Sequence, residues 1–159
     1  MIDLILAIKF IHVLFAAAMF GTWLGTAGFM LLACRSGNPS VVALVAHFAV
    51  RIELFVVAAA LAMQPISGFP LAAAIGLTAL NEFWIDVSLL LYVAVVAVWL
   101  ASLYVEIRLR NMARQAALGR GTLADNYPRL FRIWFALATF LIAATIAIIL
   151  LMVWQPRLD

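Results

Sequence analysis

The sequence predicts an all-α, polytopic membrane protein: a bundle of four transmembrane helices with the N- and C-termini both outside the cytoplasm. Three observations support this fold class. The 159-residue chain is 69% hydrophobic and 11% charged, with a mean hydropathy of +1.19, whereas soluble domains carry about 25% charged residues. Four apolar stretches reach the roughly 20 residues that cross a bilayer. The basic residues gather in the loops of one side, which marks that side as cytoplasmic.

A single transmembrane domain is expected, with helices at about 4–33, 40–64, 83–110 and 128–154. The first stretch is too long for a cleaved signal peptide and lacks its basic start, so we expect it to remain as a span. Asn38 followed by Pro39 is typical of a helix N-cap and first position. Gln64-Pro65 is expected to end the second helix. The short apolar segment at about 69–80 is expected to lie on, or dip into, the outer surface. Asn81 can cap the third helix, which is expected to continue past the membrane into the cytoplasm.

The arginines give the orientation. Residues 52–107 contain no Lys or Arg. The two loops on the other side contain Arg35, Arg108, Arg110, Arg114, Arg120, Arg129 and Arg132. Anionic lipid headgroups are the natural partners of these side chains, and no aromatic interleaving or binding motif indicates nucleic acid.

Several chemistries are disfavoured by the residues that are present. The single Cys34 excludes an internal disulfide and a cysteine metal cluster. Two histidines are too few for a zinc enzyme with ordinary ligand counts. No Walker loop, dinucleotide glycine fingerprint, HExxH or CxxC occurs. The sequence therefore assigns no catalytic residue and leaves open whether the protein is an enzyme.

The stretch "RIELFVVAAALAMQPISG" at residues 51–68 resembles the signature of a family of predicted bacterial integral membrane proteins, domain-of-unknown-function family 2269. The shared pattern is an arginine, an acid two residues later, an apolar run, Gln-Pro and Ser-Gly, although Glu53 stands where Asp is expected. "AIKFIH", "VEIRLRNMA" and "YPRLFRIWFALATF" extend the resemblance to nearly the whole chain. It implies a multi-pass protein of the bacterial cytoplasmic (inner) membrane and implies no activity.

The stretch "IKFIHVLFAAAMFGTW" resembles, more distantly, the first helix of J-type protoporphyrinogen oxidases and of copper-resistance D-type membrane proteins. The shared pattern is Lys-x-x-His with a glycine about nine residues later, here Lys9, His12 and Gly21. In the oxidases the histidine of this helix is implicated in haem b binding. The resemblance therefore implies that His12 ligates a haem iron.

The helix rise argues against one haem shared by His12 and His47. With the first two helices aligned at the turn between them, the histidines differ by about 15 residues, or about 22 Å of depth. Axial ligands of one iron need nearly equal depth, so His47 is a candidate ligand of a second haem iron. Met63 and Gln64 lie near the depth of His12, and methionine can ligate haem iron.

The other intramembrane polar residues have alternative roles. His12 could instead be a neutral imidazole bonded to a neighbouring helix, and His47 could pair with a carbonyl group or with Arg51. Arg51 is a candidate partner of a haem propionate, of a quinone-like headgroup or of an acid on another helix. Glu53 points away from Arg51 and is a functional candidate because ionisable residues are costly in a membrane. Lys9 is expected to extend to the outer surface.

One face of the first helix carries His12, Met19, Trp23 and Thr26. Gly21, Gly25 and Gly28 lie near the opposite side, so "GTWLG" predicts a seam where a neighbouring helix approaches closely.

Together these observations predict an integral membrane protein that binds haem b and acts in electron transfer or redox chemistry, with a membrane redox partner or a second copy beside it. Two other function classes stay open. One is a cofactor-free accessory subunit that packs through the glycine seam. The other is a small oligomeric transporter in which Arg51 and Glu53 line a polar path.

Overall fold

The computed structural model describes residues 2–74, 76, 82–119 and 121–156, and the regular structure in these ranges is helical. The elements are α1 (Ile2–Arg35), α2 (Pro39–Ile52), the π-helical turn η1 (Glu53–Val57), α3 (Ala58–Ala74), α4 (Phe83–Leu118) and α5 (Tyr127–Trp154). Because α2, η1 and α3 follow one another directly, they form one long span. Within the described residues, four helical rods are long and apolar enough to cross a membrane. The predicted all-α fold with four membrane-spanning helices is confirmed.

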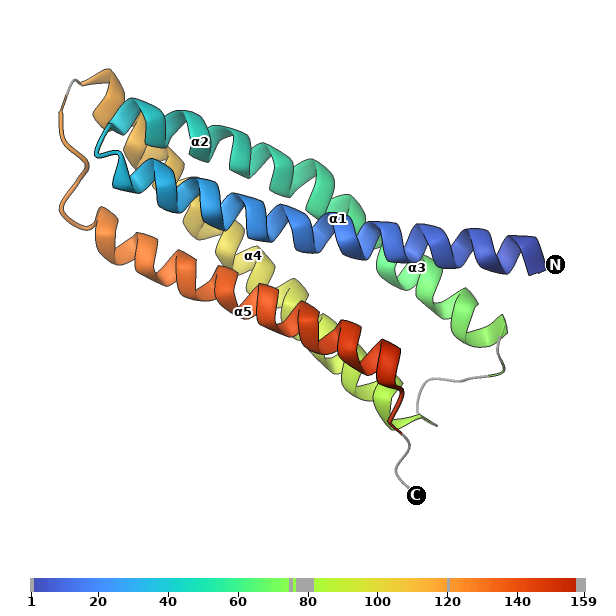
Figure 1. Ribbon diagram of the computed structural model, residues 1–159. Helices are drawn as coiled ribbons and strands as arrows, with labels where there is room; N and C mark the ends of the chain where they lie inside the picture. Colours follow the sequence, from blue (N-terminus) through green and yellow to red (C-terminus); the bar gives the residue numbers. More distant parts are fainter. Residues whose placement is uncertain (1, 75, 77–81, 120, 157–159) are drawn as a thin grey trace.

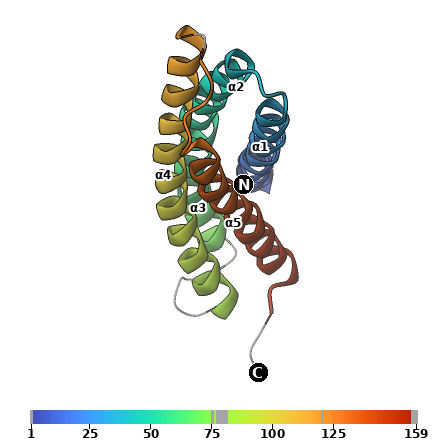
Figure 2. The same cartoon turned by 90° about the vertical axis from the view of Figure 1, so that its left-hand side faces the viewer.

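Successive spans run in opposite directions (Figure 1). α4 packs along α5 and α2, and α1 packs along α3 and α2. Figure 2 shows α1 and α4 on opposite sides of the bundle. The α1–α2 turn and the α4–α5 connection lie at one end, called here the arginine-rich end because it carries Arg35, Arg108, Arg110, Arg114, Arg129 and Arg132. α1 begins and α5 ends at the opposite end, called here the terminal end.

Two apolar clusters fill the bundle, one above the other. The terminal-end cluster includes Trp23, Val57, Leu61, Val95 and Trp99. The arginine-end cluster includes Met30, Val42, Leu109, Tyr127 and Trp134. Lipid is as apolar as these side chains, so close packing rather than exclusion from water holds them together. The buried polar residues Thr26, Glu53 and Glu106 lie close to the level where the two clusters meet.

The start of the second span agrees with its prediction. Asn38 is the N-cap of α2, and its Oδ1 accepts a hydrogen bond from the backbone N–H of Ser40 at 2.9 Å. Pro39 occupies the first helical turn, where its missing N–H costs nothing. The asparagine-proline pair therefore ends the turn after α1 and begins the second span.

The prediction that Gln64-Pro65 ends the second span is wrong. α3 continues through Pro65 and Pro70 to Ala74. A proline inside a helix leaves the carbonyl four residues earlier without its usual donor. For Pro65 that carbonyl belongs to Leu61, and the Tyr92 hydroxyl of α4 donates to it at 2.7 Å. A neighbouring helix thus supplies the missing hydrogen bond, as happens in membranes, and the span continues.

Other boundaries differ less. α4 extends to Leu118, beyond the span expected to end at about 110, in agreement with the expected continuation of the third helix past the membrane. Residues 69–74 of the expected outer-surface segment belong to α3, and most of the remainder lies outside the described residues. Asn81, the expected cap of the third span, also lies outside the described residues. In the structure Glu82 is the N-cap residue of α4.

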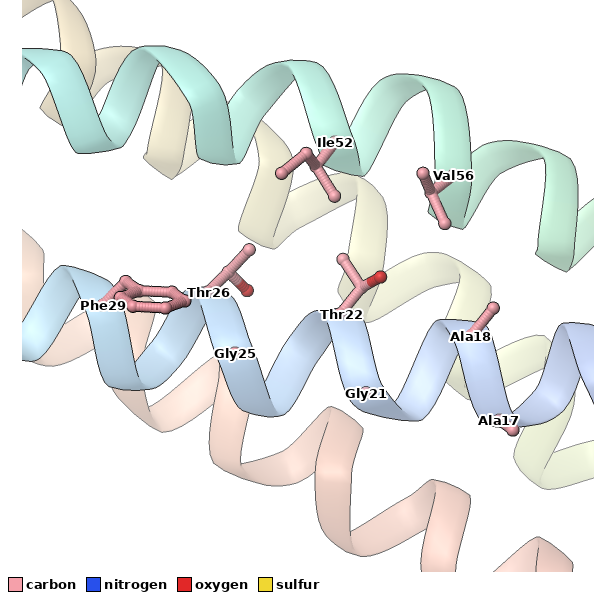
Figure 3. Close-up of a pocket in the computed structure, with 9 residues that line it drawn as sticks. All are labelled: Ala17, Ala18, Gly21, Thr22, Gly25, Thr26, Phe29, Ile52 and Val56. Carbon is pink, nitrogen blue, oxygen red and sulfur yellow. The ribbon is translucent and has the colours of Figure 1, made fainter.

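Among the described residues, no helix packs closely against the predicted glycine seam. A Cβ atom built on Gly21, Gly25 or Gly28 would meet no atom of the described chain within 4 Å. An open groove of about 350 Å³ runs instead between α1 and the α2–η1 stretch. Figure 3 shows Gly21 and Gly25 along it, with the side chains of Thr22 and Thr26 pointing towards Ile52 and Val56.

Candidate functional site

His12 is held at the contact between α1 and α3, in the half of the bundle nearer the terminal end. Its Nδ1 lies 2.8 Å from the Ser67 hydroxyl. One turn away, the Gln64 side-chain amide donates to the main-chain oxygen of His12 at 3.3 Å. A Cβ atom at Gly68 would lie 3.3 Å from Cε1 of the imidazole, so glycine gives the ring room against α3. The segment after the Gln-Pro pair therefore receives the histidine of α1.

The contacts of Ser67 assign the imidazole tautomer. A serine hydroxyl has one proton to donate, and Ser67 donates it to the Met63 carbonyl of its own helix at 2.5 Å. The hydroxyl oxygen then accepts from His12, so Nδ1 carries the ring proton. Nε2 keeps its lone pair, and no residue of the described ranges is hydrogen-bonded to it. The imidazole of His12 is thus hydrogen-bonded to a neighbouring helix, as expected if its role is structural. Its Nε2 is also available to ligate a metal.

The remaining predicted ligands lie at two different levels. His47 is exposed on α2, edge-on to the Phe48 ring with the centroids 5.8 Å apart. Ser67, which holds His12, follows His47 by 20 residues in the same span, about 30 Å along a helix. The two histidines are therefore too far apart for one iron. Met63 is half-buried one turn before Ser67, which places it near the level of His12.

Arg51 and Lys9 are both exposed. Arg51 precedes Ser67 by 16 residues of the second span, about 24 Å, so it cannot reach a group bound at His12. Lys9 lies three residues before His12 on α1, which makes the two side chains neighbours on the helix surface. The cation at the level of His12 is therefore Lys9.

Glu53 is the centre of a second polar site, near the middle of the bundle. Its side chain is only 5% exposed, and Oε2 accepts hydrogen bonds from the indole N–H groups of Trp99 at 2.8 Å and Trp23 at 3.2 Å. The carboxyl group therefore joins α1, η1 and α4. Glu53 also opens the π-helical turn, closed by the bond from the Ala58 N–H to the Glu53 carbonyl, a distortion that is frequent at functional sites. Arg51, by contrast, is exposed.

Glu106 is the site residue that sequence reasoning missed. It is 1% exposed on α4, and its Oε1 has no hydrogen-bond partner among the described residues. Glu53 and Arg110 lie close enough to act on it electrostatically. A sequence signal existed, because Glu106 falls on the helical stripe of buried positions Trp99, Ser102, Leu103, Leu109 and Ala113.

The donor atoms limit which metal groups the chain could hold. Within the described residues, no three His, Cys, Asp or Glu side chains come together as a metal site. Haem makes a smaller demand, because the protein supplies only axial ligands to its iron. A single histidine with a free nitrogen, such as His12, meets that demand.

Comparison of the chain with curated proteins and with solved structures gives no match. A family model described as "Predicted integral membrane protein (DUF2269)" matches residues 6–156. This range contains all four spans almost completely, together with His12, Glu53 and Glu106. The chain therefore belongs to the DUF2269 family of predicted integral membrane proteins.

Proposed function

We propose that this chain is a membrane haem b protein with an electron-transfer role, and that His12 is an axial ligand of the haem iron. The orientation of His12 carries the proposal. Metal-ligating histidines almost always donate the second ring N–H to a hydrogen-bond acceptor, which fixes the tautomer and the ring. His12 has this arrangement, because Nδ1 donates to Ser67 and Nε2 is left as the ligand atom.

The surroundings of His12 fit a haem in charge and polarity. Lys9 lies within one turn and would pair with a propionate group, the role first expected of Arg51. The same part of α1 exposes Phe10, Val13 and Leu14, apolar side chains that a porphyrin face or lipid can cover. Met63 is the candidate second axial ligand because it lies near the same level and a thioether can ligate haem iron.

Bound haem would supply one-electron chemistry, and the chain would hold the group and set its potential. His12 would hold the iron, and the Ser67 hydroxyl keeps the imidazole from rotating. The apolar neighbours lower the local dielectric and limit the access of water, which are the usual means by which a protein tunes such a centre. Electron donor and acceptor would approach from the membrane or from the terminal end.

Haem content of matched variants tests the proposal. Protein expressed with haem precursors and purified in detergent should show a haem b spectrum that sharpens on reduction. His12→Ala should lose most of this pigment. His47→Ala should keep it, because Ser67, the partner of His12, lies about 30 Å from His47 along the second span. Size-exclusion chromatography of both variants shows whether each still folds.

Two results would overturn the haem proposal. One is a wild-type protein that stays colourless when haem is supplied. The other is a folded His12→Ala protein with the wild-type haem content. Equal loss in both single variants at one haem per chain would show that the two histidines share an iron, contrary to their separation.

A second candidate function is that of an accessory subunit, and the open glycine seam favours it. A helix of another subunit can approach Gly21 and Gly25 closely because no side chain of this chain covers them. Gly25→Leu would fill the groove and should reduce the oligomeric mass or the co-purification of partner subunits. Gly28→Leu is the matched control, because Gly28 is also uncovered but does not line the groove. An unchanged mass in both variants would exclude this use of the groove.

A further inference from the structure

Glu53 and Glu106 are two buried carboxyl groups that the proposed haem site does not use. They are 5% and 1% exposed, and both lie close to the level where the two apolar clusters meet. Trp23, which bonds Glu53, follows His12 by 11 residues on α1, about 16 Å along the helix. The carboxyl pair is therefore a separate site within the bundle.

The two carboxyl groups differ in how they are satisfied. Glu53 has two indole donors on Oε2, and the Thr26 side chain is a further hydrogen-bond partner of its carboxyl group. Glu106 has a buried Oε1 with no partner at all among the described residues. An unpaired buried polar atom destabilises the folded state, and its presence in a folded protein calls for an occupant such as a proton or water. The unpaired oxygen of Glu106 thus points to a ligand.

The chemistry of the surroundings favours a proton over a metal ion. A hard cation needs six or more oxygen ligands, whereas Glu53 is surrounded by indole N–H donors, which repel cations. α1 adds Trp23 and Thr26, neither of which titrates. The titratable pair deeper in the arginine-end cluster, Cys34 and Tyr127, is bonded to itself at 3.6 Å. A proton needs no coordination shell, and it removes the high cost of a bare carboxylate in the membrane.

The half-buried Arg110 marks the side from which water can approach the site. Arg110 lies one turn from Glu106 towards the arginine-rich end and is only half-buried, and its guanidinium donates to Asn111 at 3.1 and 3.2 Å. Water that solvates this side chain comes within one helical turn of Glu106. On the other side, Val57, Leu61 and Val95 of the terminal-end cluster separate Glu53 from the terminal end. Access is therefore expected beside Arg110.

We infer that Glu53 and Glu106 form an intramembrane proton-binding site that exchanges protons with the arginine-rich end of α4. Water beside Arg110 gives a proton to Glu106 as an O–H bond in that water breaks and one to the carboxyl oxygen forms. Passage to Glu53 breaks the O–H bond on Glu106 and forms one on a carboxyl oxygen of Glu53, through water that takes up one proton as it gives up another. The Trp23 and Trp99 indoles hold Glu53 in place throughout. The site does not require bound haem.

Infrared spectroscopy of the protein in lipid nanodiscs tests this inference. The wild type should show the carbonyl stretch of a protonated carboxylic acid at neutral pH. Transfer to D₂O should shift that band, since the site exchanges protons with water. Glu106→Gln and Glu53→Gln should each change or remove the band while keeping a side chain of the same shape. Glu82→Gln is the matched control, since Glu82 lies at the start of α4 and is partly exposed.

Three results would overturn the inference: a neutral-pH wild-type spectrum without the band, a band that does not shift in D₂O, or a band that persists in both glutamine variants. The first two need no variant, so the test stands even if a variant does not fold. Haem-free and haem-loaded protein should give the same carboxyl band. If the haem proposal alone were wrong, the carboxyl band would therefore be unchanged.

Discussion

The His12 site and the Glu53 site both include residues of the long second span, but other helices enclose them to different degrees. Glu53 is enclosed by α1, η1 and α4, and its Oε2 is bonded to two buried indoles. His12 lies half-buried at the contact of only α1 and α3, with one ring nitrogen bonded and the other free. The carboxyl group at the centre of the bundle is hydrogen-bonded by side chains of its own chain. The imidazole near the end of the bundle keeps one nitrogen available for a bound ligand.

The comparison separates residues that stabilise from residues that function. Glu53 ties three elements together, so its loss should damage the fold. The Oε1 of Glu106 has no hydrogen-bond partner among the described residues, and a buried group that lowers stability in this way is expected where function requires it. His12 combines both features, because Ser67 fixes the ring while Nε2 has no hydrogen-bond partner in the part of the chain that the structure describes.

The largest expected effect concerns which site faces which side of the membrane. A reporter that is active only outside the cytoplasm should be active when fused after Asp159 and silent when inserted at Gly119. The arginines near Gly119 should keep that loop in the cytoplasm. Reporter activity in bacterial cells measures this. Activity only at Gly119 would reverse the orientation and place the His12 site at the cytoplasmic side.

The next effect separates the two glutamates. Glu53→Leu leaves two buried indole N–H groups unpaired, at about 1–3 kcal/mol each, and should clearly lower the free energy of unfolding in a denaturing-detergent titration. Glu106→Leu removes a buried carboxyl group from which no donor is lost, so it should be neutral or stabilising. Similar destabilisation by both substitutions would mean that Glu106 also holds the bundle together.

A smaller effect distinguishes two glycines. A Cβ atom at Gly68 lies 3.3 Å from the His12 ring, whereas one at Gly25 meets nothing within 4 Å. Gly68→Ala should therefore be less stable than Gly25→Ala by about 1 kcal/mol, the low end of the cost of overpacking. Thermal unfolding of the two variants in the same detergent gives the difference. A Gly68→Ala protein at least as stable as Gly25→Ala would mean that the ring moves away freely.

Most of the fold follows from the sequence because the membrane leaves few alternatives. Apolar length predicts four spans, and Asn38-Pro39 predicts the start of α2. The continuation through Pro65 could not be predicted, since it depends on the Tyr92 hydroxyl, 27 residues later in the chain. The local sequence predicts the helix break that a proline favours. It does not identify the distant hydrogen-bond donor that compensates for the proline.

The candidate sites were only partly predictable, for a similar reason. His12 and Glu53 stand out as ionisable residues within apolar runs. Glu106 precedes a run of arginines, and this charge pattern favours a solvated segment, although the helical stripe from Trp99 to Ala113 indicates burial. The partners of each group, Ser67 for His12 and the two indoles for Glu53, come from other helices. Only the packing brings them together.

Chemical rescue tests the central claim, iron ligation by His12, most directly. His12→Gly removes the imidazole and leaves space of about its size, so haem should be lost and then regained when free imidazole is added during haem reconstitution. The recovered spectrum should match that of the wild type, while imidazole should not alter His47→Gly. A His12→Gly protein that keeps its haem without added imidazole would contradict the claim and leave His12 as a hydrogen-bonding partner of Ser67.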